Sequence, residues 1–130
     1  MQNFTDKLKN LAPGDHLCCL YNTEEEHQAL LTPFLLQGIE QNQKVVYIVD
    51  ARTSDEVLDY LRGGRVNIEQ AVEKGQLWML SARESYLKNG VFDPDAMIDL
   101  LRAETERAIA DGYDALRVTG EMSWALQNVP

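Results

Sequence analysis

Short runs that are apolar on both faces alternate with longer segments of helical periodicity, and this alternation constrains the fold most. The runs are His16–Tyr21, Lys44–Asp50, Gln76–Ser81 and Ala115–Thr119. A strand that is apolar on both faces is buried between two layers, which is typical of a parallel sheet. The helical segments between the runs supply the crossovers that parallel strands need. We therefore predict an α/β fold in which helices sandwich a mostly parallel sheet.

Capping residues mark the predicted helices. Thr23 and Glu26 form a capping box before a helix whose apolar stripe reaches Ile39 and which Pro33 should kink. Further helices are predicted over Ser54–Leu61, from the cap Asn67 to Gly75, and from Asp93-Pro94 to Gly112. The sequence contains no repeat and no linker, so we expect residues 1–130 to form a single domain.

The charge balance limits the partners of this domain. Twelve basic residues against 21 acidic ones give a formal net charge of −9, which repels nucleic-acid phosphates and anionic lipid. We therefore expect no direct contact with nucleic acid or with a membrane. No apolar run approaches the roughly 20 residues that span a bilayer, and the amino terminus is polar, so we expect a cytoplasmic protein.

The turn after the first predicted strand does not suit a nucleotide phosphate. A phosphate-binding loop needs glycines and a lysine, whereas this turn reads Asn22-Thr-Glu-Glu-Glu26. Lys44 begins a strand and so lies at the opposite end of the sheet. We expect no nucleotide hydrolysis.

Metal binding and thiol chemistry are not expected either. His16 and His27 would lie roughly 17 Å apart, at opposite ends of a strand, so one ion could not bridge them. Cys18 and Cys19 are neighbours in an apolar run, and we interpret them as small buried hydrophobes that form no disulfide. We therefore predict no metal and no cofactor.

Ligands of parallel α/β sheets bind beyond the carboxyl ends of the strands. This rule selects one rim, made of Tyr21–Glu25, Asp50–Thr53, Ser81–Tyr86 and Thr119–Trp124. Aromatic side chains and a few carboxylates suit a small organic or cationic ligand, or else complete the core. Arg117, in the fourth strand, should need Glu121 or Asp50 as its partner. The candidate ligand-binding residues are Tyr21, Asp50, Tyr86, Phe92, Arg117, Glu121 and Trp124, followed by Glu25.

Four segments carry a family resemblance: GDHLCCLY, PFLLQGIEQNQKVVYIVD, GQLWML…ESYLKNGVFDPDAMI and LRVTGEMSWAL. They resemble the MEDS domain, the methanogen/methylotroph DcmR sensory domain, from about Asp15 to Leu126. The resemblance implies a RecA-like fold of the circadian-clock ATPase type with a degenerate phosphate loop. It implies a non-enzymatic domain that senses a small organic molecule, a hydrocarbon or C1-type derivative.

The resemblance also bears on partners. Such domains are often attached to histidine kinases or DNA-binding regulators, so we expect such a module, fused or separate. The family pattern continues with a further strand, whereas this chain ends at Asn128-Val-Pro130. A trimmed chain, a short stand-alone member or a homodimer that completes the sheet edge would each account for this. The alternative functions are a protein-interaction or dimerisation module without a small ligand, and a residual nucleotide binder.

Overall fold

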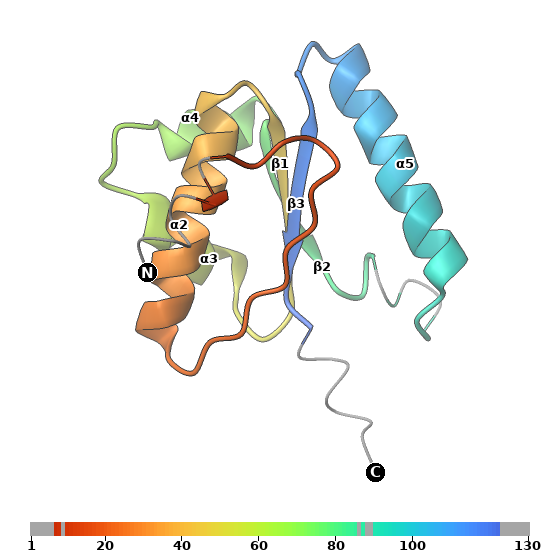
Figure 1. Cartoon of the computed structure of the whole chain (residues 1–130), viewed down its shortest axis with the longest axis horizontal. Helices are drawn as coiled ribbons and strands as arrows, with labels where there is room; N and C mark the ends of the chain where they lie inside the picture. The colour runs from red at the N-terminus through yellow and green to blue at the C-terminus, as the bar shows by residue number, and fades with distance from the viewer. Residues whose placement is uncertain (1–6, 9, 86, 88–89, 123–130) are drawn as a thin grey trace.

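The computed structural model describes residues 7–8, 10–85, 87 and 90–122. Its main elements alternate in the predicted way, and three parallel strands are arranged in the order β2-β1-β3. The predicted α/β fold with a parallel sheet between helices is confirmed (Figure 1). The elements are α2 (Glu24–Glu40), β1 (Lys44–Val49), α3 (Ser54–Leu61), α4 (Ile68–Glu73), β2 (Leu77–Ser81), α5 (Pro94–Ala110) and β3 (Leu116–Gly120).

The central strand β1 is buried along its whole length. Its sequence KVVYIV is rich in β-branched and aromatic residues, which favour a strand packed on both faces. Val45 pairs with Leu77 of β2 and with Arg117 of β3, and this register brings the carboxyl ends of all the strands to one edge.

Helices α2, α3 and α4 cover one face of the sheet (Figure 1). Tyr47 of β1 and Leu35 of α2 are among the largest fully buried side chains there. Gly38 lets α2 approach the sheet closely, because a Cβ atom at this position would lie 2.7 Å from Cδ of Arg117 and 2.8 Å from Cγ2 of Val45. This face holds the larger of the two apolar cores.

The other face of the sheet is covered by α5 (Figure 1). Val46, Ile48 and Leu80 are buried beneath it, and Met97 and Leu100 of α5 pack against them. Within α5 only Glu104 and Ala108 are buried. The second core is therefore small, and a charged residue forms part of it.

The predicted helix boundaries agree with the caps in the structure. Oγ1 of Thr23 accepts a hydrogen bond from the Glu26 amide at 3.1 Å, and the Glu26 carboxylate accepts one from the Asn22 amide at 3.3 Å. Asn67 caps α4, and Asp93 caps α5 with Pro94 in the first turn. Pro33 lies inside α2, as expected. Within the described residues, no helix is both long and apolar enough to cross a membrane.

One predicted strand is absent. His16–Tyr21 forms a loop in Figure 1 and pairs with no described strand. The side chain of Leu20 is 93% exposed, Cys18 is exposed and Cys19 is partly buried, so the prediction that both cysteines are buried is also wrong. An apolar run becomes a strand only where a neighbouring strand offers its hydrogen-bonding edge, and the run itself carries no information about that neighbour.

Candidate functional site

The carboxylate of Glu121 organises the rim at the carboxyl ends of β1 and β3. Glu121 directly follows β3 and is only 5% exposed. Its Oε2 accepts hydrogen bonds from the amides of Asp50 at 3.0 Å, Ala51 at 2.7 Å and Arg52 at 3.2 Å. Its Oε1 accepts one from the Tyr47 hydroxyl at 2.8 Å. This carboxylate therefore fixes the loop that follows β1, and we call these five residues the Glu121 cluster.

The side chain of Arg52 links the Glu121 cluster to the start of α2. Its guanidinium donates two hydrogen bonds to the Glu24 carboxylate, at 2.6 and 3.0 Å, and one to the Tyr21 hydroxyl at 3.1 Å. It also lies 3.4 Å from Oε1 of Glu121. Burial opposes its charge, but the bonds to Glu24 and Tyr21 dominate and raise the pKa of Arg52. The hydrogen bonds from Arg52 lower the pKa of Glu24.

His27 of α2 is 3% exposed and lies between two tyrosine hydroxyls. Its Nε2 is 3.2 Å from the Tyr47 hydroxyl, and its Nδ1 is 3.4 Å from the Tyr60 hydroxyl. Because the Tyr47 hydroxyl donates to Glu121, its oxygen is left to accept, so the Nε2–H tautomer fits this site. Burial and the positive charge of Arg52 lower the pKa of His27.

Tyr47 remains a neutral donor in this arrangement. Burial and the adjacent Glu121 carboxylate raise the pKa of its phenol far above the usual range. The rim is thus a set of charges and hydroxyls that bind one another. Within the described residues, no group of three His, Cys, Asp or Glu side chains could hold a metal ion.

One polar atom of the rim has no such partner. Oδ2 of Asp50 is buried and makes no hydrogen bond within the described part of the chain. The Tyr21 ring is tilted against the His27 ring, with the two ring centroids 4.7 Å apart, and Tyr21 is 38% exposed. The rim therefore combines a buried acceptor that lacks a hydrogen bond with a partly exposed aromatic side chain, and a ligand with a donor group could use both.

The structure brings together three of the predicted site residues: the Asp50 amide bonds to Glu121, and Arg52 links Glu121 to Tyr21. Glu25 is exposed in the first turn of α2, and Phe92 is 44% exposed in the loop before α5. Tyr86 and Trp124 lie outside the described residues.

The predicted pairing of Arg117 with Glu121 or Asp50 is wrong. Its guanidinium donates to Oε1 of Gln43 at 2.7 Å and to the carbonyl oxygen of Phe34 at 2.8 Å. The register places Arg117 opposite Val45, near the start of β1, whereas Glu121 follows the end of β3. Burial lowers the pKa of Arg117. Its observed partners are neutral oxygens, and nothing in the sequence pattern indicates that they would be preferred to a carboxylate.

Sequence reasoning missed several members of the network: Glu24, His27, Tyr47, Arg52 and Tyr60. A signal existed for Arg52 and Glu24, because both fall in segments that were assigned to the rim, and opposite charges on neighbouring rim loops favour an ion pair. No signal existed for Tyr47 and Tyr60, whose hydroxyls reach the rim only because of how β1 and α3 pack.

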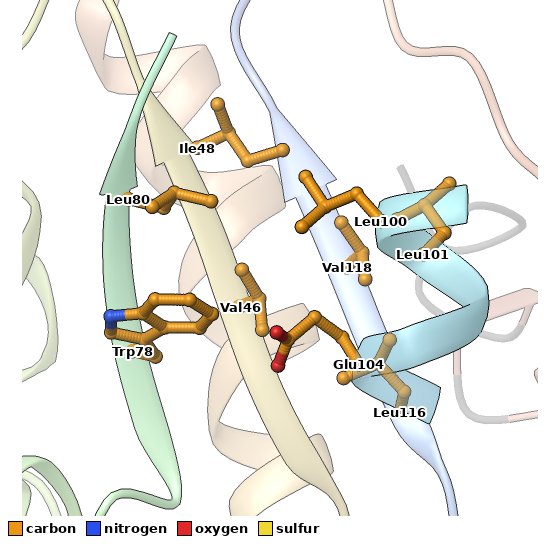
Figure 2. Close-up of a pocket in the computed structure, with 9 residues that line it drawn as sticks. All are labelled: Val46, Ile48, Trp78, Leu80, Leu100, Leu101, Glu104, Leu116 and Val118. Atoms are coloured by element: carbon orange, nitrogen blue, oxygen red, sulfur yellow. The ribbon is translucent and has the colours of Figure 1, made fainter. Parts of the chain in front are cut away.

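A small cavity lies between α5 and the face of the sheet opposite to α2 (Figure 2). Its lining is apolar except for Glu104, whose carboxylate Figure 2 shows directed from α5 toward Val46 and Trp78. The residues that line it are Val46, Ile48, Trp78, Leu80, Leu100, Leu101, Glu104, Leu116 and Val118.

Comparisons with known proteins identify the family. The sequence pattern described as MEDS, the MEthanogen/methylotroph, DcmR Sensory domain, matches residues 15–130. A curated protein named Transcriptional repressor DcmR, from Methylorubrum extorquens, is 24% identical over 117 residues. That match covers 90% of this chain and 41% of the relative, so the chain spans less than half of the relative's length. No solved structure matches the chain. Because the family pattern covers most of its residues, this chain belongs to the MEDS sensory-domain family.

Proposed function

We propose that this chain is a non-enzymatic sensory domain that binds a small organic molecule at the rim of its sheet. The buried Oδ2 of Asp50, which lacks a hydrogen bond and belongs to a residue bonded to Glu121, is the observation that carries the proposal. A buried acceptor without a donor is costly, and a ligand that supplies the donor recovers that free energy. Membership of a sensory family supports the same role.

The ligand would be a hydrocarbon or C1-type derivative with one donor group. Its donor would bond to Asp50, while its apolar part would contact Tyr21 and Phe92, with Tyr86, Trp124 and Glu25 as further candidates. Arg117 bonds directly to α2, away from the rim, and takes no direct part in the proposed site. The turn Asn22–Glu26 would replace a phosphate loop on a RecA-like scaffold, with Glu24 engaged by Arg52.

The signal would pass from the rim through α2. Because Arg52 joins the loop after β1 to Glu24, a ligand that moves Asp50 changes the contacts of the first turn of α2. The ligand then favours one of two arrangements of these elements. The relative is a transcriptional repressor, so we propose a cytoplasmic partner that is a DNA-binding regulator or a histidine kinase, fused or separate.

A thermal-shift panel tests the proposal. It compares small methylated, halogenated and aliphatic compounds with Mg-ATP and Mg-GTP. A ligand at about a hundred times its Kd adds roughly 2.7 kcal/mol, which at roughly 4 °C per kcal/mol raises the Tm of a domain this size by about 11 °C. Asp50→Asn, which converts one carboxylate oxygen into a donor, should abolish the shift, whereas the exposed Asp99→Asn should keep it. A shift that survives Asp50→Asn would contradict the rim site.

An interaction module remains the second candidate because large apolar side chains are exposed. Leu20 is 93%, Val91 68% and Met122 51% exposed. Among the described residues, the outer edge of β3 pairs with no strand, and such an edge can recruit a second copy. This function predicts no ligand shift in the panel and a Tm that rises with protein concentration. A shift with nucleotides alone would instead indicate a residual nucleotide binder.

A further inference from the structure

His27 is a buried titratable group that the proposed ligand site does not use. It lies in α2, is 3% exposed, and contacts β1 through the Tyr47 hydroxyl and α3 through the Tyr60 hydroxyl. The Tyr47 hydroxyl also bonds to the Glu121 carboxylate, and the Tyr60 hydroxyl to the Glu24 carboxylate. His27 therefore joins the two hydroxyls in one series of hydrogen-bonding groups, which runs from the end of β3 to the start of α2.

Each hydroxyl of this series has a single proton to donate. The Tyr47 proton goes to Oε1 of Glu121 at 2.8 Å, and the Tyr60 proton goes to Oε2 of Glu24 at 3.1 Å. Both hydroxyl oxygens therefore turn their lone pairs toward the imidazole of His27, so both need a donor from it.

A neutral imidazole cannot donate to both oxygens, because only one of its nitrogens carries a proton. In the Nε2–H tautomer, Nε2 donates to Tyr47 at 3.2 Å, but the lone pair of Nδ1 faces the Tyr60 oxygen at 3.4 Å. In the other tautomer, the lone pair of Nε2 faces the Tyr47 oxygen instead. A Tyr60 proton turned toward Nδ1 only moves the deficit, because Glu24 then loses its bond from Tyr60. The series is one proton short in each arrangement.

An imidazolium has an N–H group on both nitrogens and so supplies the missing proton. Its Nε2 then donates to Tyr47 and its Nδ1 to Tyr60, whose oxygen has a second lone pair for the neighbouring Arg52. Arg52 in turn bonds to Glu24 and lies 3.4 Å from Oε1 of Glu121. These hydrogen bonds and this ion pair then form a closed ring.

The charges around His27 also leave room for one more positive charge. Glu24 and Glu121 are the carboxylates that face it, and Arg52 is the cation. The other titratable groups against it are three phenols: Tyr21, Tyr47 and Tyr60. Two negative charges and one positive charge leave a net −1, which an imidazolium neutralises. Burial and Arg52 nevertheless lower the pKa of His27, so the folded chain takes up this proton at a lower pH than the unfolded chain.

We propose that His27 is a proton-binding switch, and that one proton taken up between the Tyr47 and Tyr60 hydroxyls completes a ring that joins α2, α3 and the loop after β1. In the neutral state, the Tyr60 proton has two competing acceptors; in the protonated state, it bonds to Glu24 alone. The ring includes the carboxylate of Glu121, which fixes the loop after β1. The inference goes beyond the proposed function, because it assigns a proton site that needs no organic ligand.

NMR of the intact, 15N-labelled chain from roughly pH 8 to roughly pH 4 tests the switch. His27→Gln distinguishes the resonances of His27 from those of His16. The imidazole nitrogens should show one bonded proton, on Nε2, at high pH and one on each nitrogen at low pH, while the chain stays folded. The Ala51 amide, which bonds to Glu121, should shift with the same midpoint. An imidazole that gains no second proton before the chain unfolds, or an Ala51 amide that does not follow it, would overturn the proposal.

Two substitutions separate the ring from the general effect of burial. Tyr60→Phe removes the oxygen that accepts from Nδ1 of the imidazolium. His27 should then bind its proton about tenfold more weakly, so that its midpoint falls by about one pH unit. Tyr113→Phe, which removes a hydroxyl before the start of β3 and thus at the opposite end of the sheet, should leave the midpoint unchanged. A midpoint in Tyr60→Phe equal to that of the native chain would refute the ring.

Discussion

Glu121→Gln should destabilise the protein by removing a charge on which the rim loop depends. In the native protein, Oε2 accepts three backbone N–H bonds and Oε1 accepts the Tyr47 hydroxyl. A hydrogen bond to a charged acceptor contributes about 1.5–3 kcal/mol, against about 0.5–1.5 kcal/mol for a neutral one. The difference of about 1 kcal/mol at each of the three amides gives a total loss of about 3 kcal/mol. When the Gln side-chain oxygen accepts from the three amides, its NH₂ group faces the Tyr47 hydroxyl. That hydroxyl then loses its acceptor, while its oxygen already lies beside Nε2 of His27.

Urea unfolding followed by circular dichroism measures this loss directly. At roughly 4 °C per kcal/mol, the Tm should fall by about 12 °C. The exposed Glu106→Gln is the matched control, and it should change the free energy of unfolding by less than about 0.5 kcal/mol. A change of that small size for Glu121→Gln would refute the view that its carboxylate holds the loop after β1.

Three further perturbations follow from the structure. Gly38→Ala should cost about 1–3 kcal/mol in urea unfolding, because the added Cβ meets Cδ of Arg117 at 2.7 Å; an unchanged midpoint would show that α2 can shift freely. His27 has a lowered pKa, so the unfolded chain binds a proton more readily; stability should be constant above pH 6.5 and fall as the pH drops below that value, and His27→Gln should flatten this part of the profile. Cys18 is exposed, whereas burial and the neighbouring thiol raise the pKa of Cys19, so a thiol reagent should label Cys18 first; equal rates would contradict this order.

Much of the fold could be predicted from local signals. Each helix described here begins at a residue whose side chain caps it, and β1 is apolar on both faces, so short stretches of sequence contained the necessary information. The segment His16–Tyr21 shows where this reasoning ends. Its apolar pattern is like that of β1, but a strand also requires a neighbour with free hydrogen-bonding groups, which is a property of the whole fold.

The candidate site was predictable only in part. The rule for the carboxyl ends of parallel strands placed Asp50 and Glu121 on one rim, where the Asp50 amide bonds to the Glu121 carboxylate. Tyr21 reaches the same rim by its bond to Arg52, although the strand that was predicted to end at Tyr21 is absent. The rule could not assign partners. Glu121 pairs with Arg52 and not with Arg117. The prediction failed because the sequence pattern does not show how far the guanidinium of Arg117 lies from the rim.

The bonds that Glu121 makes have a consequence for the order of folding. They join residues 69 to 74 positions apart in the chain. Contacts over such separations form late, because a long loop must first be closed. During synthesis, Arg52 emerges only 28 positions after Glu24, so these two side chains can pair early. At that stage the loop after β1 still lacks the Glu121 carboxylate that fixes its amides. The rim is therefore completed only when β3 docks, so a chain interrupted before that strand would lack the carboxylate that fixes the loop after β1.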